Sequence, residues 1–263
     1  MTKKKKKKKF KISGILFLIC LAIFLVSGYE VFTLYTTQKK EEDSFAELRE
    51  ATETVGVVGT AQVANTEGKQ EVVEDQRSKY EILHEKNSDD VAWIHIDNTH
   101  VDYSVMHTPN NIEYYLRRSF DGEWANAGTP FIGADCDLNS QVYIVYGHNM
   151  KNKTIFGDLD KYKDKTFWES TPEFTIETEN EFRTYRIFAN VVTDFSHADA
   201  FAYHTYVGDL SEEDFDKLID WGINNSPYKT GERPSYEDQI VILSTCSYHD
   251  ENGRFVIMGY RVD

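Results

Sequence analysis

Cysteine is scarce in this chain, with three among 263 residues. One of them, Cys20, lies inside a long apolar run, so the rest of the chain holds only Cys136 and Cys246. This count excludes a small disulfide scaffold, which needs several bridges to replace a hydrophobic core. A single bridge between Cys136 and Cys246 is compatible with the sequence, but a free thiol is the stronger expectation.

Metal-ligand clusters and positive charge are also lacking. No His or Cys cluster has the spacing of metal ligands, so we expect neither a metal site nor a cofactor. Eight of the basic residues, Lys3 to Lys9 and Lys11, lie in the first eleven positions, and beyond them 21 basic residues face 44 acidic ones, a net charge of −23. A body this acidic lacks the clustered Lys and Arg that neutralise phosphates, which excludes a nucleic-acid-binding surface.

A long apolar run follows the lysines. Ile12 to Tyr35 contains one charged residue, Glu30, near its far end. As a helix it covers about 35 Å, enough for a hydrocarbon core of about 30 Å. The lysine cluster is expected to stay on the cytoplasmic side, which places the remainder outside the cell. A cleaved signal peptide is the alternative, but the run exceeds an h-region of about 7 to 15 residues, and Ser27-Gly28-Tyr29 is a poor cleavage site.

Composition divides the chain into four parts. We expect a basic cytoplasmic tail at residues 1–11, a transmembrane anchor at 12–35, an extracytoplasmic stalk at 36–78 and one compact domain at 79–263. The stalk is rich in Glu, Thr, Lys, Gln and Ala, and such a composition buries too little apolar surface to offset the entropy of ordering. Within it, Glu41 to Thr54 is compatible with partial helix.

The domain at 79–263 has the pattern of a mostly β protein. Short runs of apolar and β-branched residues predict eight strands: Val91–Ile96, Val101–Val105, Thr129–Ile132, Val142–Tyr146, Phe174–Thr178, Tyr185–Thr193, Gln239–Thr245 and Phe255–Val262. Many short strands separated by turns indicate a β-barrel or a β-sandwich.

Three helical segments interrupt the strands. We predict a short helix at Tyr80–Glu85 and a helical turn at Asn111–Arg117. A longer helix begins at Ser211, which with Asp214 resembles a capping box and is followed by an i, i+3, i+4 apolar stripe. This helix lies in a long insertion, Ser196 to Glu237, which is the natural place for a substrate-facing lid.

The strand predicted at Gln239–Thr245 ends directly at Cys246, and Arg254 begins the next apolar strand. If the two strands pair as an antiparallel hairpin, Cys246 and Arg254 face each other across its mouth. A guanidinium there would present several fixed donors to the oxyanion that forms when a thiolate attacks a carbonyl. The alternative is an ordinary hairpin with a buried cysteine and a surface arginine.

Another apolar strand, Val142 to Tyr146, ends in Gly147-His148-Asn149. Cysteine catalysis needs such an imidazole, because the thiolate is the nucleophile and the departing amine requires a proton. We expect structural or surface roles for the seven other histidines: His84, His95, His100, His107, His197, His204 and His249. Among these, His249 is the competing base, since it follows Cys246 by three residues.

These motifs resemble the sortases, and the class B members most closely. Sortases carry a Thr-Leu-x-Thr-Cys strand end, a downstream Arg at the start of the next strand and an upstream catalytic His. This chain offers Leu243-Ser244-Thr245-Cys246, then Arg254, with His148 upstream. It differs at Ile242, where the family usually has Thr, a position that concerns strand packing. The resemblance covers nearly everything after the stalk, and the helix at Ser211–Asn224 resembles the class B elaboration, as does helical material before the first strand.

The resemblance implies a mostly β fold: a closed β-barrel of about eight strands with peripheral helices, preceded by one transmembrane helix. It implies transpeptidation at the cell wall of a Gram-positive bacterium, in which Cys246 attacks a Thr carbonyl in the C-terminal sorting signal of a secreted protein. The thioacyl enzyme is then resolved by an amine, typically from a peptidoglycan precursor such as lipid II. His148 would be general acid and base, Arg254 would hold the substrate and stabilise the oxyanion, and Ser244 and Thr245 would shape the substrate site.

Two other classes of function stay open. An extracellular cysteine hydrolase could use the same chemistry, but papain-like families place Cys before His, and caspase-like enzymes need a Gln-Ala-Cys neighbourhood that Cys246 lacks. A non-catalytic surface binding module would have inert cysteines. The sequence also leaves open the sorting signal, of the Asn-Pro-x-Thr or the Leu-Pro-x-Thr-Gly kind, the acceptor amine, and the choice between wall anchoring and pilus assembly.

Overall fold

A computed structural model describes residues 6–53, 79–196, 200–246 and 253–263. His197, His249 and most of the predicted stalk lie outside these ranges. The chain divides into two compact units, Met1–Ser44 and Phe45–Asp263.

The first unit is helical. Helix α1 (Lys6–Glu53) contains the apolar run, and its large apolar side chains between Ile15 and Tyr35 are exposed. The helix is long and apolar enough to cross a membrane. The predicted transmembrane segment is therefore helical, as its composition requires.

The C-terminal end of α1 belongs to the second unit. Phe45 and Leu48 are buried there, and the ring of Phe45 packs edge-on against Tyr103, with ring centroids 4.9 Å apart. Part of the predicted stalk is thus helical because two apolar residues in its polar sequence find a surface to cover. The boundary between stalk and domain at residue 78 stays a prediction.

The second unit is built on a closed β-barrel with the strand order β1-β2-β3-β4-β7-β8-β6-β5. The strands are β1 (Asp90–His95), β2 (Asp102–Met106), β3 (Phe131–Ile132), β4 (Val142–Tyr146), β5 (Glu173–Glu177), β6 (Phe182–Asp194), β7 (Ile240–Cys246) and β8 (Gly253–Arg261). All eight predicted strands are present, with ends shifted by three residues at most. Closure decides between the two expected architectures in favour of the barrel and leaves no open sheet edge.

Strands β4 and β7 contain runs of consecutive buried residues, Val142–Val145 and Ile240–Leu243. Both faces of these strands are covered, one by the barrel interior and the other by surrounding helices and loops. This explains why their sequences are continuous apolar runs without alternation. The two strands pair in parallel, with Tyr146 opposite Ser244.

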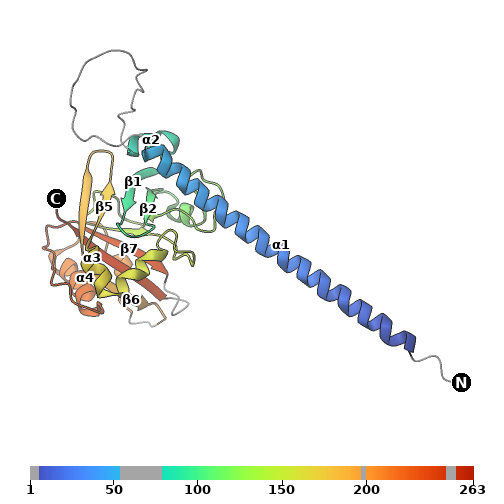
Figure 1. Cartoon of the computed structure of the whole chain (residues 1–263). Coiled ribbons are helices and arrows are strands. Elements are labelled where there is room, and N and C mark those ends of the chain that lie inside the picture. The colour runs from blue at the N-terminus through green and yellow to red at the C-terminus, as the bar shows by residue number, and fades with distance from the viewer. Residues whose placement is uncertain (1–5, 54–78, 197–199, 247–252) are drawn as a thin grey trace, which may run out of the picture. The chain divides into compact units, whose positions relative to one another are not determined.

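The predicted helices are confirmed as α2 (Lys79–Lys86), the 3₁₀ turn η1 (Ile112–Arg117) and α4 (Glu212–Asn225). The N-terminus of α4 is capped as expected, because the Asp214 amide donates to Ser211 Oγ at 3.2 Å. Helix α4 packs on β6, as Figure 1 shows. Close approach requires Gly222, since a Cβ there would come within 2.6 Å of Met258 Sδ.

Three helical segments were not predicted: η2 (Gly157–Lys163), α3 (Lys165–Ser170) and η3 (Tyr203–Thr205). Segment η2 depends on distant partners. Its buried Asp158 accepts hydrogen bonds from the His100 amide at 3.0 Å and from the His100 ring at 2.7 Å. Contacts of this kind are not visible in a local pattern.

Candidate active site

The end of the β7–β8 hairpin holds two of the predicted site residues. The strands are antiparallel, and their register places Cys246, the last residue of β7, opposite Arg254 in β8. The hairpin geometry expected from the sequence is therefore confirmed. The connection between the strands, residues 247–252, lies outside the described ranges.

Strand β4 brings His148 to the same end of the barrel. Because β4 and β7 are parallel, their C-terminal ends lie side by side, and the amide of Gly147 continues the ladder by donating to the Ser244 carbonyl at 3.2 Å. His148 follows immediately. The sheet thus gathers residues that are almost a hundred positions apart in the sequence.

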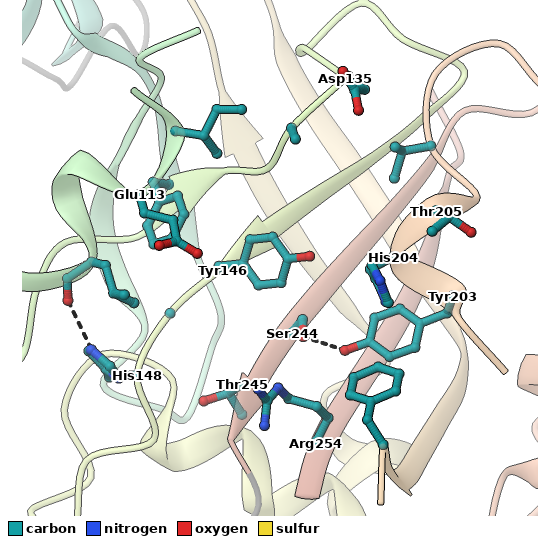
Figure 2. A pocket seen from close by; sticks show the side chains of 17 residues that line it. Glu113, Asp135, Tyr146, His148, Tyr203, His204, Thr205, Ser244, Thr245 and Arg254 are labelled. Atoms are coloured by element: carbon teal, nitrogen blue, oxygen red, sulfur yellow. Dashed lines mark hydrogen bonds between the residues drawn. The ribbon is translucent and has the colours of Figure 1, made fainter. Parts of the chain in front are cut away.

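The tautomer of His148 follows from its partner. Nε2 lies 2.9 Å from the Leu116 carbonyl oxygen, which can only accept, so Nε2 carries the proton (Figure 2). In the neutral ring Nδ1 is then a proton acceptor. Burial, together with the positive charge of Arg117, lowers the pKa of His148 below its ordinary value of 6.5. The imidazole is therefore neutral at neutral pH and able to accept a proton.

Most N–H donors of Arg254 are not used by the residues that the structure describes. Its half-buried guanidinium donates from Nη1 to the Gly253 carbonyl at 3.0 Å, and its Cζ lies 5.9 Å from the centroid of the Phe195 ring. Within the described ranges no carboxylate forms an ion pair with it. A guanidinium has five N–H donors, so several are left for a bound oxygen.

His148 and Arg254 line one cavity of about 760 Å³, a volume that suits a short peptide segment. Residues of η1 form one wall and residues of the insertion between β6 and β7 form the other, while Tyr146 and Ser244 lie between them, as Figure 2 shows. Part of the insertion is thus a fixed wall of the site, consistent with the expected substrate-facing position. Residues 197–199 of the insertion are not described.

Ser244 and Thr245 both line this cavity. Ser244 Oγ shares a hydrogen bond of 2.7 Å with Tyr203 Oη. Thr245 Oγ1 is buried, and no partner for it is found in the described part of the chain. A buried hydroxyl without a partner is costly, so it is a group that a bound substrate could satisfy.

The sequence did not predict the position of several residues that line or support the cavity. Leu116 orients the imidazole through its backbone carbonyl, and Tyr203 and His204 line the opposite wall. His204 was expected to have only a structural or surface role. No local signal marks these positions, because each acts through a neighbour in space.

Two further histidines, His84 and His95, make side-chain contacts with the protein scaffold. His95 lies between Asp97 and Asp102, at 3.0 Å from each, and His84 Nδ1 donates to the Asp90 carbonyl oxygen at 2.7 Å. No group of three His, Cys, Asp or Glu side chains is placed to hold a metal ion among the residues described.

Cys136 is a free, buried thiol, so it forms no bridge with Cys246. Burial is the main cause that raises the pKa of Cys136, to about 11, and a thiol of this pKa is unreactive at neutral pH. Cys136 is therefore a poor candidate for a nucleophile.

Comparison with known proteins gives a consistent family. The family model described as "Sortase domain" matches residues 94–262. Sortase B of Listeria monocytogenes is 32% identical over 92% of this chain and 93% of its own length, and sortase B of Staphylococcus aureus is 23% identical over the same shares.

Solved structures similar to this chain are also sortase B structures. The crystal structure of sortase B from B. anthracis in complex with AAEK1 superposes with a TM-score of 0.69 at 25% identity, covering 87% of this chain and 99% of the other. Sortase B from Listeria monocytogenes gives a TM-score of 0.59 at 32% identity, with 68% and 97% of the two chains covered. The match of the family model over most of the chain, and these relatives, show that the chain belongs to the sortase family of cysteine transpeptidases, within class B.

Proposed function

We propose that Cys246, His148 and Arg254 are the catalytic residues of this cell-wall transpeptidase. The observation that carries the proposal is the pairing of β4 with β7 and of β7 with β8. The first register puts the strand end before His148 beside the strand that ends at Cys246, and the second puts Cys246 opposite Arg254, which has no carboxylate partner among the described residues.

In the first step Cys246 attacks the carbonyl carbon of a Thr in the sorting signal. The thiol proton passes to Nδ1 of His148, the ring nitrogen that the Leu116 contact leaves as an acceptor. A C–S bond forms, and the carbonyl oxygen becomes an oxyanion that Arg254 stabilises through the N–H donors that no described residue uses. The C–N bond then breaks, and His148 returns the proton to the departing amine.

In the second step an amine of a peptidoglycan precursor attacks the thioacyl carbon. His148 accepts the proton that this amine loses, a new amide bond forms, and the C–S bond breaks. The sulfur leaves as a thiolate and takes the proton back from His148. Atoms and protons balance over the two steps, and no metal or cofactor takes part.

Substrate contacts follow from the same cavity. We assign to the entering peptide Ser244 and the hydroxyl group of Thr245, which has no partner among the described residues. The secreted substrate would carry an Asn-Pro-x-Thr or Leu-Pro-x-Thr-Gly signal, and the acceptor would be an amine of lipid II type.

The membrane arrangement is part of the proposal. The apolar helix would anchor the chain by a single span, with the lysine-rich end in the cytoplasm and the barrel facing the cell wall. Residues 36–78 would connect the span to the catalytic domain at 79–263. This arrangement places the cavity where exported proteins and lipid-linked precursors meet.

Mass spectrometry of the full chain in detergent tests the chemistry. The chain is incubated with peptides of both signal types, and a Cys246→Ala variant is the control. Cleavage after Thr, with an acyl adduct on Cys246 that an added amine such as triglycine resolves, is the expected result. Release of free acid with no amide product would instead indicate a hydrolase. An intact peptide pool, with Cys246 still alkylatable, would contradict the proposal.

A further inference from the structure

The guanidinium of Arg254 lies against an aromatic face. Its Cζ is 5.9 Å from the centroid of Phe195, within the range of a cation–π contact. Phe195 follows directly after β6, where Thr193 is the register partner of Arg254. The ring is therefore placed by the sheet beside the residue it contacts.

A stack of rings fixes the orientation of Phe195. It lies on Tyr203, with centroids 5.7 Å apart and planes inclined by 24°. Tyr203 stacks in turn on Trp221 of α4, at 5.3 Å and 12°. Offset and near-parallel rings of this kind attract one another beyond the area they bury.

The stack is tied to the floor of the cavity as well. Tyr203 is buried, and its hydroxyl group shares the hydrogen bond of 2.7 Å with Ser244 of β7 (Figure 2). The middle ring of the stack is thus held by the strand that leads to Cys246, and the end ring, Phe195, contacts Arg254. Relative to a free side chain, the guanidinium loses the orientations that this face does not support.

We propose that Phe195 is a positioning residue, which aims the Arg254 guanidinium into the cavity by a cation–π contact. The inference rests on the proposed role of Arg254 and adds a residue to it. An exposed arginine samples many rotamers, so the electrostatic stabilisation of an oxyanion depends on how well the donors are placed beforehand. With no carboxylate partner in the described ranges, an aromatic face is a neutral way to achieve this, because the contact with the ring uses none of the N–H groups.

Ring-conserving and ring-removing variants separate this role from packing. The full chain in detergent is assayed with whichever of the Asn-Pro-x-Thr and Leu-Pro-x-Thr peptides it cleaves. For Phe195→Leu we expect kcat to fall about 3- to 30-fold, the range of a cation–π contact, with a smaller change in KM. Phe195→Tyr and Phe195→Trp keep the π face and should restore kcat to within about two-fold of the parent.

Phe201→Leu is the matched control. Phe201 stacks on Trp221 and Tyr206 in the same insertion but does not line the cavity. We expect it to lower the midpoint of thermal unfolding at least as much as Phe195→Leu, with kcat unchanged. Equal losses of kcat in the two variants would overturn the proposal, since packing of the insertion would then be the cause.

Fluorinated phenylalanines at position 195 test the cation–π contact without changing the packing, because they keep the shape of the ring and withdraw electron density from its face. We expect kcat to decrease with each added fluorine, and a flat series would overturn the proposal.

A second readout needs no turnover. In the chain labelled with ¹⁵N-arginine, the Arg254 Nε–H resonance, assigned with Arg254→Lys, should carry a ring-current shift that Phe195→Leu removes. If no peptide is cleaved, the proposed function fails on its own, and this resonance still decides the placement of Arg254. A resonance unaffected by Phe195→Leu would overturn the inference whatever the activity.

Discussion

Two arginines at opposite ends of the barrel are held in different ways. Arg183 lies near the start of β7, and its side chain is 6% exposed. It contacts a Glu181 carboxylate oxygen at 2.6 Å and donates to the Leu138 carbonyl and to Gln239 Oε1. Among the described residues, Arg254, at the other end of the same sheet, contacts one carbonyl oxygen and one ring.

The two ends therefore differ in how their polar groups are satisfied. Around Arg183 the network continues, because Glu181 also binds Arg261, and Gln239 Nε2 donates to two carbonyl oxygens. Around Arg254, the hydroxyl group of Thr245 is buried without a partner in the described part of the chain. A guanidinium whose donors are used by the protein contributes to stability, whereas one whose donors are left free is available to a ligand.

The largest expected effect is on kcat, at the end of the barrel that holds Arg254. Arg254→Ala should lower kcat about 100- to 1000-fold, the usual consequence of removing an oxyanion donor. The free energy of unfolding should change by about 1 kcal/mol at most, because among the described residues Arg254 forms one side-chain hydrogen bond and no ion pair. Steady-state peptide cleavage and urea denaturation of the full chain in detergent measure both quantities. A kcat within tenfold of the parent would contradict the view that the donors of Arg254 serve a bound substrate.

The next effect is on the free energy of unfolding, at the end of the barrel that holds Arg183. Arg183→Ala removes several charge-assisted hydrogen bonds and should lower the free energy of unfolding by about 2 kcal/mol, while kcat per folded molecule stays the same. Arg261 first, and Arg183 second, hold the pKa of Glu181 at about 2, below its ordinary value of 4.5. The stability that this carboxylate provides is thus present above pH 4.5 and is lost as the pH falls toward 2.

Urea denaturation between pH 7 and pH 3 measures this second effect. The Arg183→Ala variant should lose less stability over that interval than the parent, because one cause of the low Glu181 pKa has been removed. A variant with the parent's stability and pH dependence would show that the hydrogen bonds of Arg183 do not stabilise this end of the barrel.

The smallest effect tests the electrostatics around His148. Burial first, and then the charge of Arg117, lower the pKa of this imidazole. Arg117→Gln should therefore raise the pKa toward 6.5, with burial still keeping it below that value. Proton NMR titration of His148 in a Cys246→Ala background measures the change without interference from the thiol.

The sign of the accompanying stability effect is fixed. Because the folded-state pKa of His148 lies below its unfolded value, the contribution of this residue to stability is present above pH 6.5 and is lost as the pH falls through the folded pKa. Arg117→Gln should reduce that loss. A downward shift of the pKa in the variant would contradict the assigned cause.

Much of the fold was readable from local patterns. The continuous apolar runs ending at Tyr146 and at Cys246 mark buried strands, and a turn-rich connection followed by Arg254 marks a hairpin, because strand periodicity and turn chemistry are local properties. The cap at Ser211 is local for the same reason. Segments such as η2, whose Asp158 depends on His100, were missed because their support comes from far along the chain.

For the candidate site, the sequence by itself determined which residues stand at strand ends: His148, Cys246 and Arg254. It also determined the apolar run that makes the N-terminal helix able to cross a membrane. Only the tertiary structure decided that these strand ends meet, because parallel pairing of β4 and β7 and closure of the barrel depend on packing between distant segments. The tautomer of His148, set by the Leu116 carbonyl, and the contact of Arg254 with Phe195 were likewise decided in space, because each joins atoms whose distance no sequence spacing fixes.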